Sequence, residues 1–226
     1  VCDIANKKEI PVVVDNTFAT PYWQKPLLLG AKVVVHSATK FLSGHGDVVA
    51  GVAVSKDQQY INKLRYGFMC ELGSPLSPFN SWLLLRGMKT LGIRMEKHAE
   101  NAMLLANYLQ EHDKVEHVWY PGLSDHEGHE IANEQMMGYG AIISFTVKGG
   151  AEKAKELLTK FKMCKLAVSL GDAETLVEHP ASMTHRDYDK ESLEEFGLSD
   201  DMVRVAVGLE DSKDIIIDFY EAFEQI

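Results

Sequence analysis

The fold is indicated by one stretch, which reads Val33-Val-Val-His-Ser37-Ala-Thr39-Lys40-Phe-Leu-Ser-Gly-His-Gly-Asp47. It begins as a continuous β-branched run, which predicts a strand buried on both faces. Open α/β sheets bind ligands at the carboxyl ends of their strands, where two hydroxyls and a lysine follow within four residues. Ser37, Thr39 and Lys40 are therefore candidates for a phosphate cradle beside a reactive amine, although an ordinary loop with a solvated lysine also fits this short stretch. The motif GxxxxGK[ST] is missing, which argues against ATP.

Similar apolar runs occur on both sides, at Pro11–Asp15 and Asp47–Ser55. They too predict strands buried on both faces. A long helical stretch follows from about residue 78 to 110, with Gly87 and Gly92 expected to divide or bend it. Further on, short strands and helices alternate. This pattern predicts an α/β protein with a second, smaller α/β domain that starts near residue 92.

Composition excludes several classes of function. The chain has 226 residues, 23 basic and 33 acidic, with a net charge of −10. That acidic balance argues against binding nucleic acid, and no apolar run approaches the ~20 residues that span a bilayer. Three widely spaced cysteines without a CxxC motif favour a reducing, cytoplasmic setting. The first residue is Val1 rather than Met, and we expect further chain to precede it.

Asp15 is the second chemical candidate, because it ends a strand that the pattern predicts to be buried. An unpaired carboxylate is costly there. The commoner interpretation is a turn residue that caps Asn16 and Thr17. The functional alternative is a counter-charge for a cationic ring nitrogen, which pyridoxal phosphate requires together with a phosphate cradle and a lysine.

The sequence resembles the Cys/Met-metabolism family of pyridoxal-phosphate enzymes, and among its members the methionine γ-lyases most. The resemblance covers essentially the whole chain. It is carried by Asp15-Asn-Thr, Ser37-Ala-Thr39-Lys40-Phe-Leu-Ser-Gly-His, Leu76-Ser-Pro-Phe-Asn, Arg86-Gly-Met-Lys-Thr-Leu, Arg94-Met, Val168-Ser169-Leu-Gly-Asp-Ala-Glu-Thr-Leu, His179-Pro-Ala-Ser-Met-Thr-His185 and Val203-Arg204-Val-Ala-Val-Gly-Leu-Glu-Asp211.

The resemblance implies a cofactor, pyridoxal 5'-phosphate, and a fold-type I transferase-like architecture. Residues 1–91 would form the C-terminal part of the cofactor-binding domain, with a mostly parallel sheet, and residues 92–226 a smaller C-terminal α/β domain. Lys40 matches the Schiff-base lysine that also serves as general base. Asp15 matches the partner of the pyridine nitrogen. Ser37 and Thr39 match the hydroxyls that bind the cofactor phosphate.

Two further positions match residues that hold the substrate α-carboxylate, namely Ser169 and Arg204. An arginine fork is well suited to clamp a carboxylate, and Arg204 opens an apolar strand where a guanidinium otherwise has little reason to lie. A surface ion pair of Arg204 with Glu210 or Asp211 is the alternative that sequence leaves open.

No metal site is expected. His126 and His129 lie in a loop rich in Pro and Gly without a further ligand at suitable spacing, so a solvated loop is the better interpretation. His179, Thr184 and His185 are expected to shape a loop near the substrate pocket.

The implied reaction is γ-elimination on a sulfur amino acid, in which L-methionine yields methanethiol, 2-oxobutanoate and ammonia. Methionine γ-lyases carry Lys-Asp where this chain has Met69-Cys70, so the leaving group stays open. The alternatives are γ-replacement, as in O-acetylhomoserine sulfhydrylase or cystathionine γ-synthase, cystathionine γ-lyase activity, and a non-catalytic truncated remnant.

The resemblance also implies a homotetramer whose active sites are shared between subunits, acting on a small amino-acid substrate. Family members carry an N-terminal portion before the strand that ends at Asp15, with a tyrosine that stacks on the cofactor ring. No counterpart of that portion is present in this sequence. We therefore expect the chain by itself to bind cofactor poorly and to lack activity.

Overall fold

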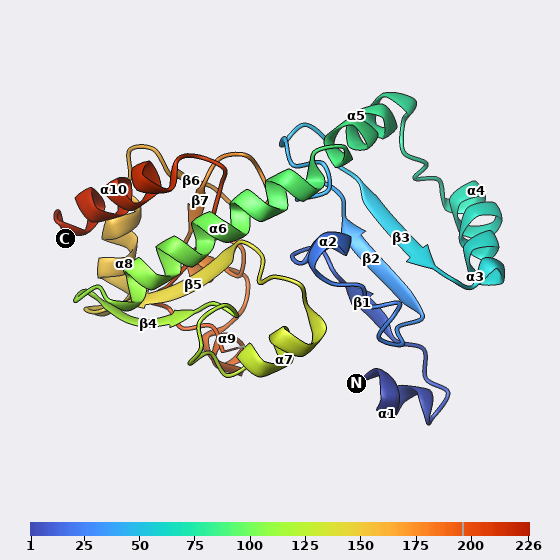
Figure 1. Cartoon of the computed structure of the whole chain (residues 1–226), viewed down its shortest axis with the longest axis horizontal. Helices are drawn as coiled ribbons and strands as arrows, with labels where there is room; N and C mark the ends of the chain where they lie inside the picture. Colours follow the sequence, from blue (N-terminus) through green and yellow to red (C-terminus); the bar gives the residue numbers. More distant parts are fainter. Residues whose placement is uncertain (196) are drawn as a thin grey trace.

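The computed structural model of the chain describes residues 1–195 and 197–226, and it contains two β-sheets joined by a long helix (Figure 1). The first sheet has the order β1-β2-β3 and the second the order β4-β5-β8-β7-β6. The strands are β1 Val13–Asp15, β2 Val33–Ser37, β3 Gly51–Ser55, β4 Val115–Trp119, β5 Ile142–Val147, β6 Lys165–Leu166, β7 Leu176–Glu178 and β8 Met202–Ala206.

Helices connect and cover these sheets. They are α1 Cys2–Asn6, α2 Thr20–Trp23, α3 Gln58–Asn62, α4 Met69–Leu72, α5 Pro78–Met88, α6 Leu91–Gln110, α7 His129–Gln135, α8 Gly150–Leu158, α9 Lys190–Glu195 and α10 Ser212–Phe223. A π-helix at Lys63–Phe68 joins α3 to α4, and a 3₁₀-helix follows β7 at Pro180–Ser182. None of the helices in the described part of the chain has the length and apolar character that crossing a bilayer requires.

The α/β fold class is confirmed, but the first sheet is mixed. β1 pairs with β2 in parallel and β3 pairs with β2 antiparallel. Of the three strands in this first sheet, only β2 is mainly buried. The prediction that β1 and β3 are buried on both faces is wrong for the described chain: Val13 is 55% exposed and Val54 is 41% exposed, because both strands lie at edges of this sheet.

Parallel pairing of β1 and β2 brings two candidate residues to the same edge. Asp15 ends β1 opposite Val35, and Ser37 ends β2 two residues further on. Carboxyl ends of parallel strands meet at one edge, which is where such sheets bind ligands. The sheet therefore places Asp15 beside the segment that carries Lys40.

The predicted division of the long helical stretch occurs, though not at a glycine. α5 ends at Met88 and α6 begins at Leu91, while Gly87 and Gly92 lie within the two helices. Gly87 has a packing role, because a Cβ there would lie 2.3 Å from the carbonyl oxygen of Ser43. α5 can therefore press against the segment after β2 only because residue 87 has no side chain.

α6 runs from the first sheet to the second (Figure 1), and two hydrophobic clusters lie along it. One fills the space between the five-stranded sheet, α6, α8 and α10. The other contains Phe41 and Leu42 from the first sheet's loop together with Met95, Leu170 and Ala206. The predicted boundary at residues 91 and 92 coincides with the start of α6, and the division into two domains stays a prediction.

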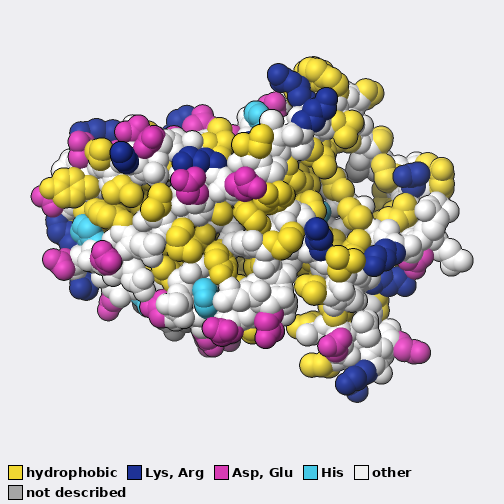
Figure 2. Space-filling view, in the orientation of Figure 1, with side chains coloured by type: hydrophobic (Ala, Val, Ile, Leu, Met, Phe, Trp, Pro, Cys, Tyr) yellow, Lys and Arg dark blue, Asp and Glu magenta, His cyan; other side chains and the backbone are white. Residues whose placement is uncertain are grey.

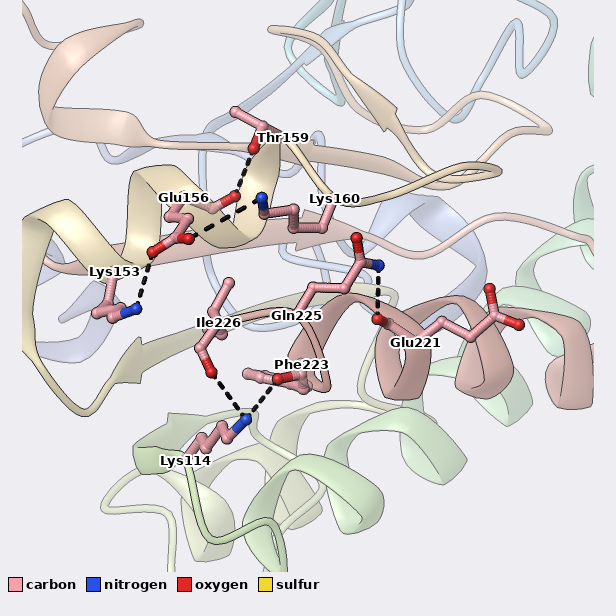
Figure 3. Close-up of polar contacts among 9 residues, drawn as sticks. All are labelled: Lys114, Lys153, Glu156, Thr159, Lys160, Glu221, Phe223, Gln225 and Ile226. Carbon is pink, nitrogen blue, oxygen red and sulfur yellow. Dashed lines mark hydrogen bonds and ion pairs between the residues drawn. The ribbon is translucent and has the colours of Figure 1, made fainter.

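The last turn of the C-terminal helix α10 is held by hydrogen bonds from Lys114. The Lys114 amine donates hydrogen bonds to the carbonyl oxygens of Phe223 and Ile226, at 2.6 and 2.9 Å (Figure 3). A lysine at a helix C-terminus satisfies carbonyls that have no partner within the helix. The same view shows Glu156 of α8 between Lys153 and Lys160.

The structure differs from the predicted elements mainly in the last third. The strand expected at residues 166–168 is β6, which ends at Leu166. The segment from His185 to Asp201, predicted to be loop-like, contains α9. Residue 196 in that segment lies outside the described residues. β7 was not predicted, because only two apolar residues, Leu176 and Val177, precede the acidic Glu178.

Hydrophobic side chains gather on the half of the molecule that holds the first sheet and α5 (Figure 2). On α5 itself, Phe79, Trp82 and Leu85 are all more than half exposed. Charged side chains are more frequent over the five-stranded sheet and its helices (Figure 2).

His98 of α6 is completely buried where the two sheets meet. Its Nδ1 lies 2.7 Å from the carbonyl oxygen of Val207, and its ring packs edge-on against Phe41 at 5.3 Å between centroids. Burial lowers the pKa of His98 to about 4, so the imidazole is neutral and Nδ1–H donates to Val207. Within the described residues Nε2 has no hydrogen-bond partner.

This buried histidine predicts acid sensitivity. An unfolded histidine titrates near 6.5, so the stabilisation from the neutral ring is complete above pH 6.5 and is lost as pH falls towards 4. The difference between 6.5 and about 4 corresponds to about 3 kcal/mol. We expect the free energy of unfolding to fall by about this much more in the wild type than in His98→Asn, whose amide keeps the donor to Val207.

The measurement is denaturant unfolding at a series of pH values from 7 to 4. His117→Asn is the matched control, because His117 is exposed on β4, and it should follow the wild type. Parallel stability curves for the wild type and His98→Asn would contradict the assignment.

Candidate active site

Lys40 lies in a tight turn that directly follows β2. The turn is closed by backbone hydrogen bonds from Lys40 N–H to the Ser37 carbonyl at 3.1 Å and from Gly44 N–H to the Lys40 carbonyl at 2.9 Å. Ala38 and Phe41, on either side, are completely buried. The buried neighbours anchor the turn and leave the Lys40 side chain half-buried at the sheet edge.

A buried arginine of α6 holds this turn from behind. Arg94 is 6% exposed, and its guanidinium donates to the carbonyl oxygens of Phe41 at 2.8 Å and Gly87 at 3.0 Å, and to Thr90 Oγ1 at 3.1 Å. A Cβ at Gly44, where φ is +70°, would lie 1.9 Å from this guanidinium. Arg94 therefore fastens α5, α6 and the Lys40 turn together.

Thr17 connects Asp15 to β2. Asp15 Oδ1 accepts hydrogen bonds from Thr17 N–H at 3.0 Å and from the Thr17 hydroxyl at 2.6 Å, and Thr17 Oγ1 in turn accepts the Ser37 N–H at 2.8 Å. Asp15 itself is exposed, so the sequence-based expectation of a buried carboxylate is wrong. The turn interpretation with Asn16 and Thr17 describes the local geometry correctly, while Asp15 also faces the site.

The two hydroxyls of the candidate phosphate cradle are arranged differently. Thr39 Oγ1 accepts the Ala50 N–H at 3.0 Å and lies 3.4 Å from the Ala50 carbonyl oxygen. The Ser37 hydroxyl makes no hydrogen bond within the described residues. Ser37 can therefore donate to an anion directly, whereas Thr39 would first turn its proton away from Ala50.

The second sheet contributes Ser169 and Arg204 to the same place. The Lys40 amine donates to Ser169 Oγ at 3.0 Å, and Arg204 Nη2 donates to the Ser169 carbonyl oxygen at 2.8 Å. Ser169 precedes Gly171, where φ is +79° and a Cβ would lie 2.4 Å from Phe41 N. This close approach lets the Ser169 loop reach Lys40.

Lys40 is electrostatically suited to act as a nucleophile or base. Burial lowers the pKa of Lys40, and the neighbouring positive charge of Arg204 lowers it further, while the Glu178 carboxylate opposes both. A lysine whose charged form is disfavoured has more of its amine in the neutral, nucleophilic form at a given pH. The environment therefore makes Lys40 more reactive than a solvated lysine.

Glu178 is the site residue that sequence reasoning missed. It ends β7 directly opposite Arg204 of β8, and its Oε1 lies 2.9 Å from Arg204 Nη1. The expected alternatives for Arg204 are both engaged elsewhere, since Glu210 accepts from Thr175 and Asp211 caps α10. The sequence signal that could have pointed to it is an acidic residue directly after the apolar pair Leu176-Val177 and before His179-Pro.

The structure also shows where the predicted histidines His185 and His129 lie. Thr184 and His185 form a hydrogen-bonded pair, and Thr184 Oγ1 donates to Glu178 Oε1 at 3.2 Å, which places this loop beside the site. The expectation of a solvated loop is wrong at His129, which begins α7, is half-buried and binds the Pro121 carbonyl oxygen through Nδ1 at 2.8 Å. The described residues contain no cluster of three or more metal-ligating side chains.

A cavity of about 640 Å³ opens between the edge of the first sheet and the segment before β5. The cavity is lined by residues at or just after the ends of β1 and β2, namely Asp15, Thr17, Ser37 and Lys40. Tyr139, before β5, and Leu170, next to Ser169, also line it. Ser169 contacts the Lys40 amine that lines the cavity, and Arg204 contacts Ser169 in turn, although neither residue lines the cavity itself. The volume lies within the range typical of cofactor and substrate sites.

These donors and charges fit pyridoxal phosphate. The cofactor needs a carboxylate at its ring nitrogen, hydroxyls or N–H groups at its phosphate, and a lysine for covalent attachment. Asp15, Ser37 and Lys40 supply those groups around one cavity. Arg204 adds a cation that matches the carboxylate of an amino acid.

Comparison with known proteins agrees with this geometry. A family model described as Cys/Met metabolism PLP-dependent enzyme matches residues 1–224. The chain is 52% identical over 216 residues to an L-methionine γ-lyase of Fusobacterium nucleatum subsp. polymorphum, covering 95% of this chain and 54% of that protein. It is 44% identical over 226 residues to a cystathionine γ-lyase of Bacillus subtilis, covering 100% of this chain and 59% of that protein.

Among solved structures, a cystathionine γ-lyase from Lactobacillus plantarum in complex with L-serine superposes with a TM-score of 0.95 at 39% identity. That match covers 100% of this chain and 58% of the other. The chain thus spans little more than half the length of these relatives. The match over nearly every residue shows that the chain belongs to the Cys/Met metabolism family of pyridoxal-phosphate-dependent enzymes.

Proposed function

We propose that this chain carries the lysine and the carboxylate clamp of a pyridoxal-phosphate-dependent lyase that eliminates the γ-substituent of a sulfur amino acid, with L-methionine as the substrate. One observation supports the proposal above others. Ser169 joins the Lys40 amine, at 3.0 Å, to the Arg204 guanidinium, at 2.8 Å from its carbonyl oxygen. An amine that attacks or removes protons thus lies next to a group that binds carboxylates.

The residues would divide the work as follows. Asp15 would hold the protonated ring nitrogen, Ser37 and Thr39 the phosphate, and Lys40 the covalent attachment. When bound, the cofactor supplies the electron sink for the carbanion chemistry. Arg204 and Ser169 would orient the amino acid by its α-carboxylate, so that the freed Lys40 amine can take the proton from Cα.

The choice of substrate rests on the relatives and not on a described side chain. The relatives named above include methionine and cystathionine lyases, which are all carbon–sulfur lyases. Met69 and Cys70 lie on α4 beyond β3, and both are exposed. Because one of these relatives is a cystathionine γ-lyase, that activity is the second candidate. γ-Replacement on an activated homoserine is the third.

The whole assembly that performs this reaction is part of the proposal. We propose a homotetramer with active sites shared between subunits, as the resemblance to the family implies. We also propose Asp15, Ser37, Thr39, Lys40, Ser169 and Arg204 as the site residues of each such centre.

The central prediction concerns Lys40. In Lys40→Ala we expect the absorbance band of covalently attached cofactor to disappear and turnover to fall by a factor of about 10³ or more, because the attaching amine and the base are lost together. Lys32→Ala is the control, since Lys32 lies beside the same sheet but pairs on the surface with Asp57 at 3.0 Å. Turnover retained in Lys40→Ala would refute the assignment.

A second prediction distinguishes elimination from replacement. Incubating the cofactor-loaded protein with L-methionine alone should release methanethiol and 2-oxobutanoate in equal amounts, measured by a thiol reagent and a keto-acid assay. A parallel incubation with L-cystathionine tests the second candidate. Product from cystathionine only would reassign the substrate, and product from neither would favour replacement or a non-catalytic chain.

A further inference from the structure

The carboxylate of Glu178 is buried beside the proposed carboxylate clamp. Glu178 is 1% exposed, and its Oε1 lies 2.9 Å from Arg204 Nη1 and accepts the Thr184 hydroxyl at 3.2 Å. The two residues face each other across the antiparallel β7–β8 pair. The register of the two strands therefore places Glu178 and Arg204 directly opposite each other.

This ion pair is poorly satisfied for a buried one. Within the described residues, Glu178 Oε2 and Arg204 Nε are both buried without a hydrogen-bond partner. Buried ion pairs contribute little stability unless all their polar atoms are satisfied, and apolar residues often serve as well. Stability of the fold thus gives little reason for an acid at residue 178.

The contacts of Arg204 suggest a different reason. Glu178 binds Nη1, and the Ser169 carbonyl oxygen accepts from Nη2 at 2.8 Å. Two acceptors on two nitrogens fix both the position and the plane of a guanidinium, and its other N–H groups remain for a ligand. Lys40, 3.0 Å from Ser169 Oγ, adds a second cation, and the Glu178 carboxylate counters the repulsion between the two.

We propose that Glu178 is a positioning residue for substrate recognition, which holds the Arg204 guanidinium where an amino acid's α-carboxylate binds without touching the substrate itself. The inference rests on the proposed function, because it takes Arg204 to be the carboxylate clamp. It adds that the clamp requires an acceptor at residue 178 at the distance given by a glutamate side chain.

The test compares two ligands that differ only in the carboxylate. L-Norleucine has no γ-substituent that can leave, and pentylamine is the same molecule without its carboxylate. Dissociation constants are measured on the cofactor-loaded assembly proposed above, by following the absorbance of the bound cofactor as each ligand is added. In the wild type, norleucine should bind more tightly than pentylamine.

Glu178→Ala should weaken norleucine binding by about 10- to 100-fold, taking as a guide the range for groups that orient metal ligands, and leave pentylamine binding within about twofold. Glu178→Gln keeps an acceptor at the same distance and should recover most of the loss. Glu178→Asp keeps the charge but is one methylene shorter, and should not. Glu174→Gln is the matched control, because Glu174 pairs with Lys165 on the surface, and it should bind both ligands as the wild type does.

Arg204→Met separates failure of the inference from failure of the proposed function. It should remove the preference for norleucine, and adding Glu178→Ala should then have no further effect. If Arg204→Met leaves the preference intact, the clamp itself is wrongly assigned. If Arg204→Met removes the preference but Glu178→Ala and Glu178→Asp bind norleucine like the wild type, only the inference fails.

An equal loss for norleucine and pentylamine in the Glu178 variants would also overturn the inference, because a purely structural residue affects both ligands alike. Should Glu178→Ala fail to fold, the contrast between Glu178→Gln and Glu178→Asp carries the same test.

Discussion

The geometry of the site depends on one buried guanidinium. Arg94 joins the carbonyl oxygens of Phe41 and Gly87 to its own helix, and Gly44 leaves the space in which it lies. A buried arginine is tolerated when its donors meet acceptors, and here three of its nitrogens do. Through this contact α6, which extends to the second sheet, fixes the turn that carries Lys40.

The second requirement is the close approach of two loops. Residue 171 must be glycine both for its positive φ and because any side chain would collide with Phe41 N. This approach places Ser169 on the Lys40 amine, 129 residues away in sequence. The site is therefore a property of the junction between the sheets, and its geometry depends on how firmly both are held there.

The charges at this junction balance as a group. Lys40 and Arg204 are two cations in a half-buried setting, and Glu178 is the buried anion that accompanies them. The same burial that favours the neutral amine of Lys40 raises the pKa of Glu178, while Arg204 acts in the opposite direction and favours its ionised form. An amino-acid carboxylate entering this group would meet the Arg204 guanidinium next to the Lys40 amine, with Ser169 between them.

The local features of the chain could be predicted well. The β-branched run before Ser37 is strand β2, the amphipathic stretch from residue 95 to 109 lies in α6, and the terminal helix is α10. The burial of β1 was predicted wrongly, because an apolar run reports only a tendency to be buried, whereas an edge position exposes it. β7 and Glu178 were missed, since two apolar residues do not make a recognisable strand pattern and the acid that follows them resembles a surface residue.

By itself the sequence determined the chemical types and their order: a lysine behind two hydroxyls after a buried strand, an acid before Asn-Thr, and an arginine within an apolar strand. Those patterns are local, because strand periodicity and turn chemistry depend on neighbouring residues. Only the tertiary structure decided that Arg204 pairs with Glu178 rather than with Glu210 or Asp211, and that Ser169 meets Lys40. A buried charge takes whichever partner the packing brings within hydrogen-bond distance, and that choice depends on the register between strands distant in sequence.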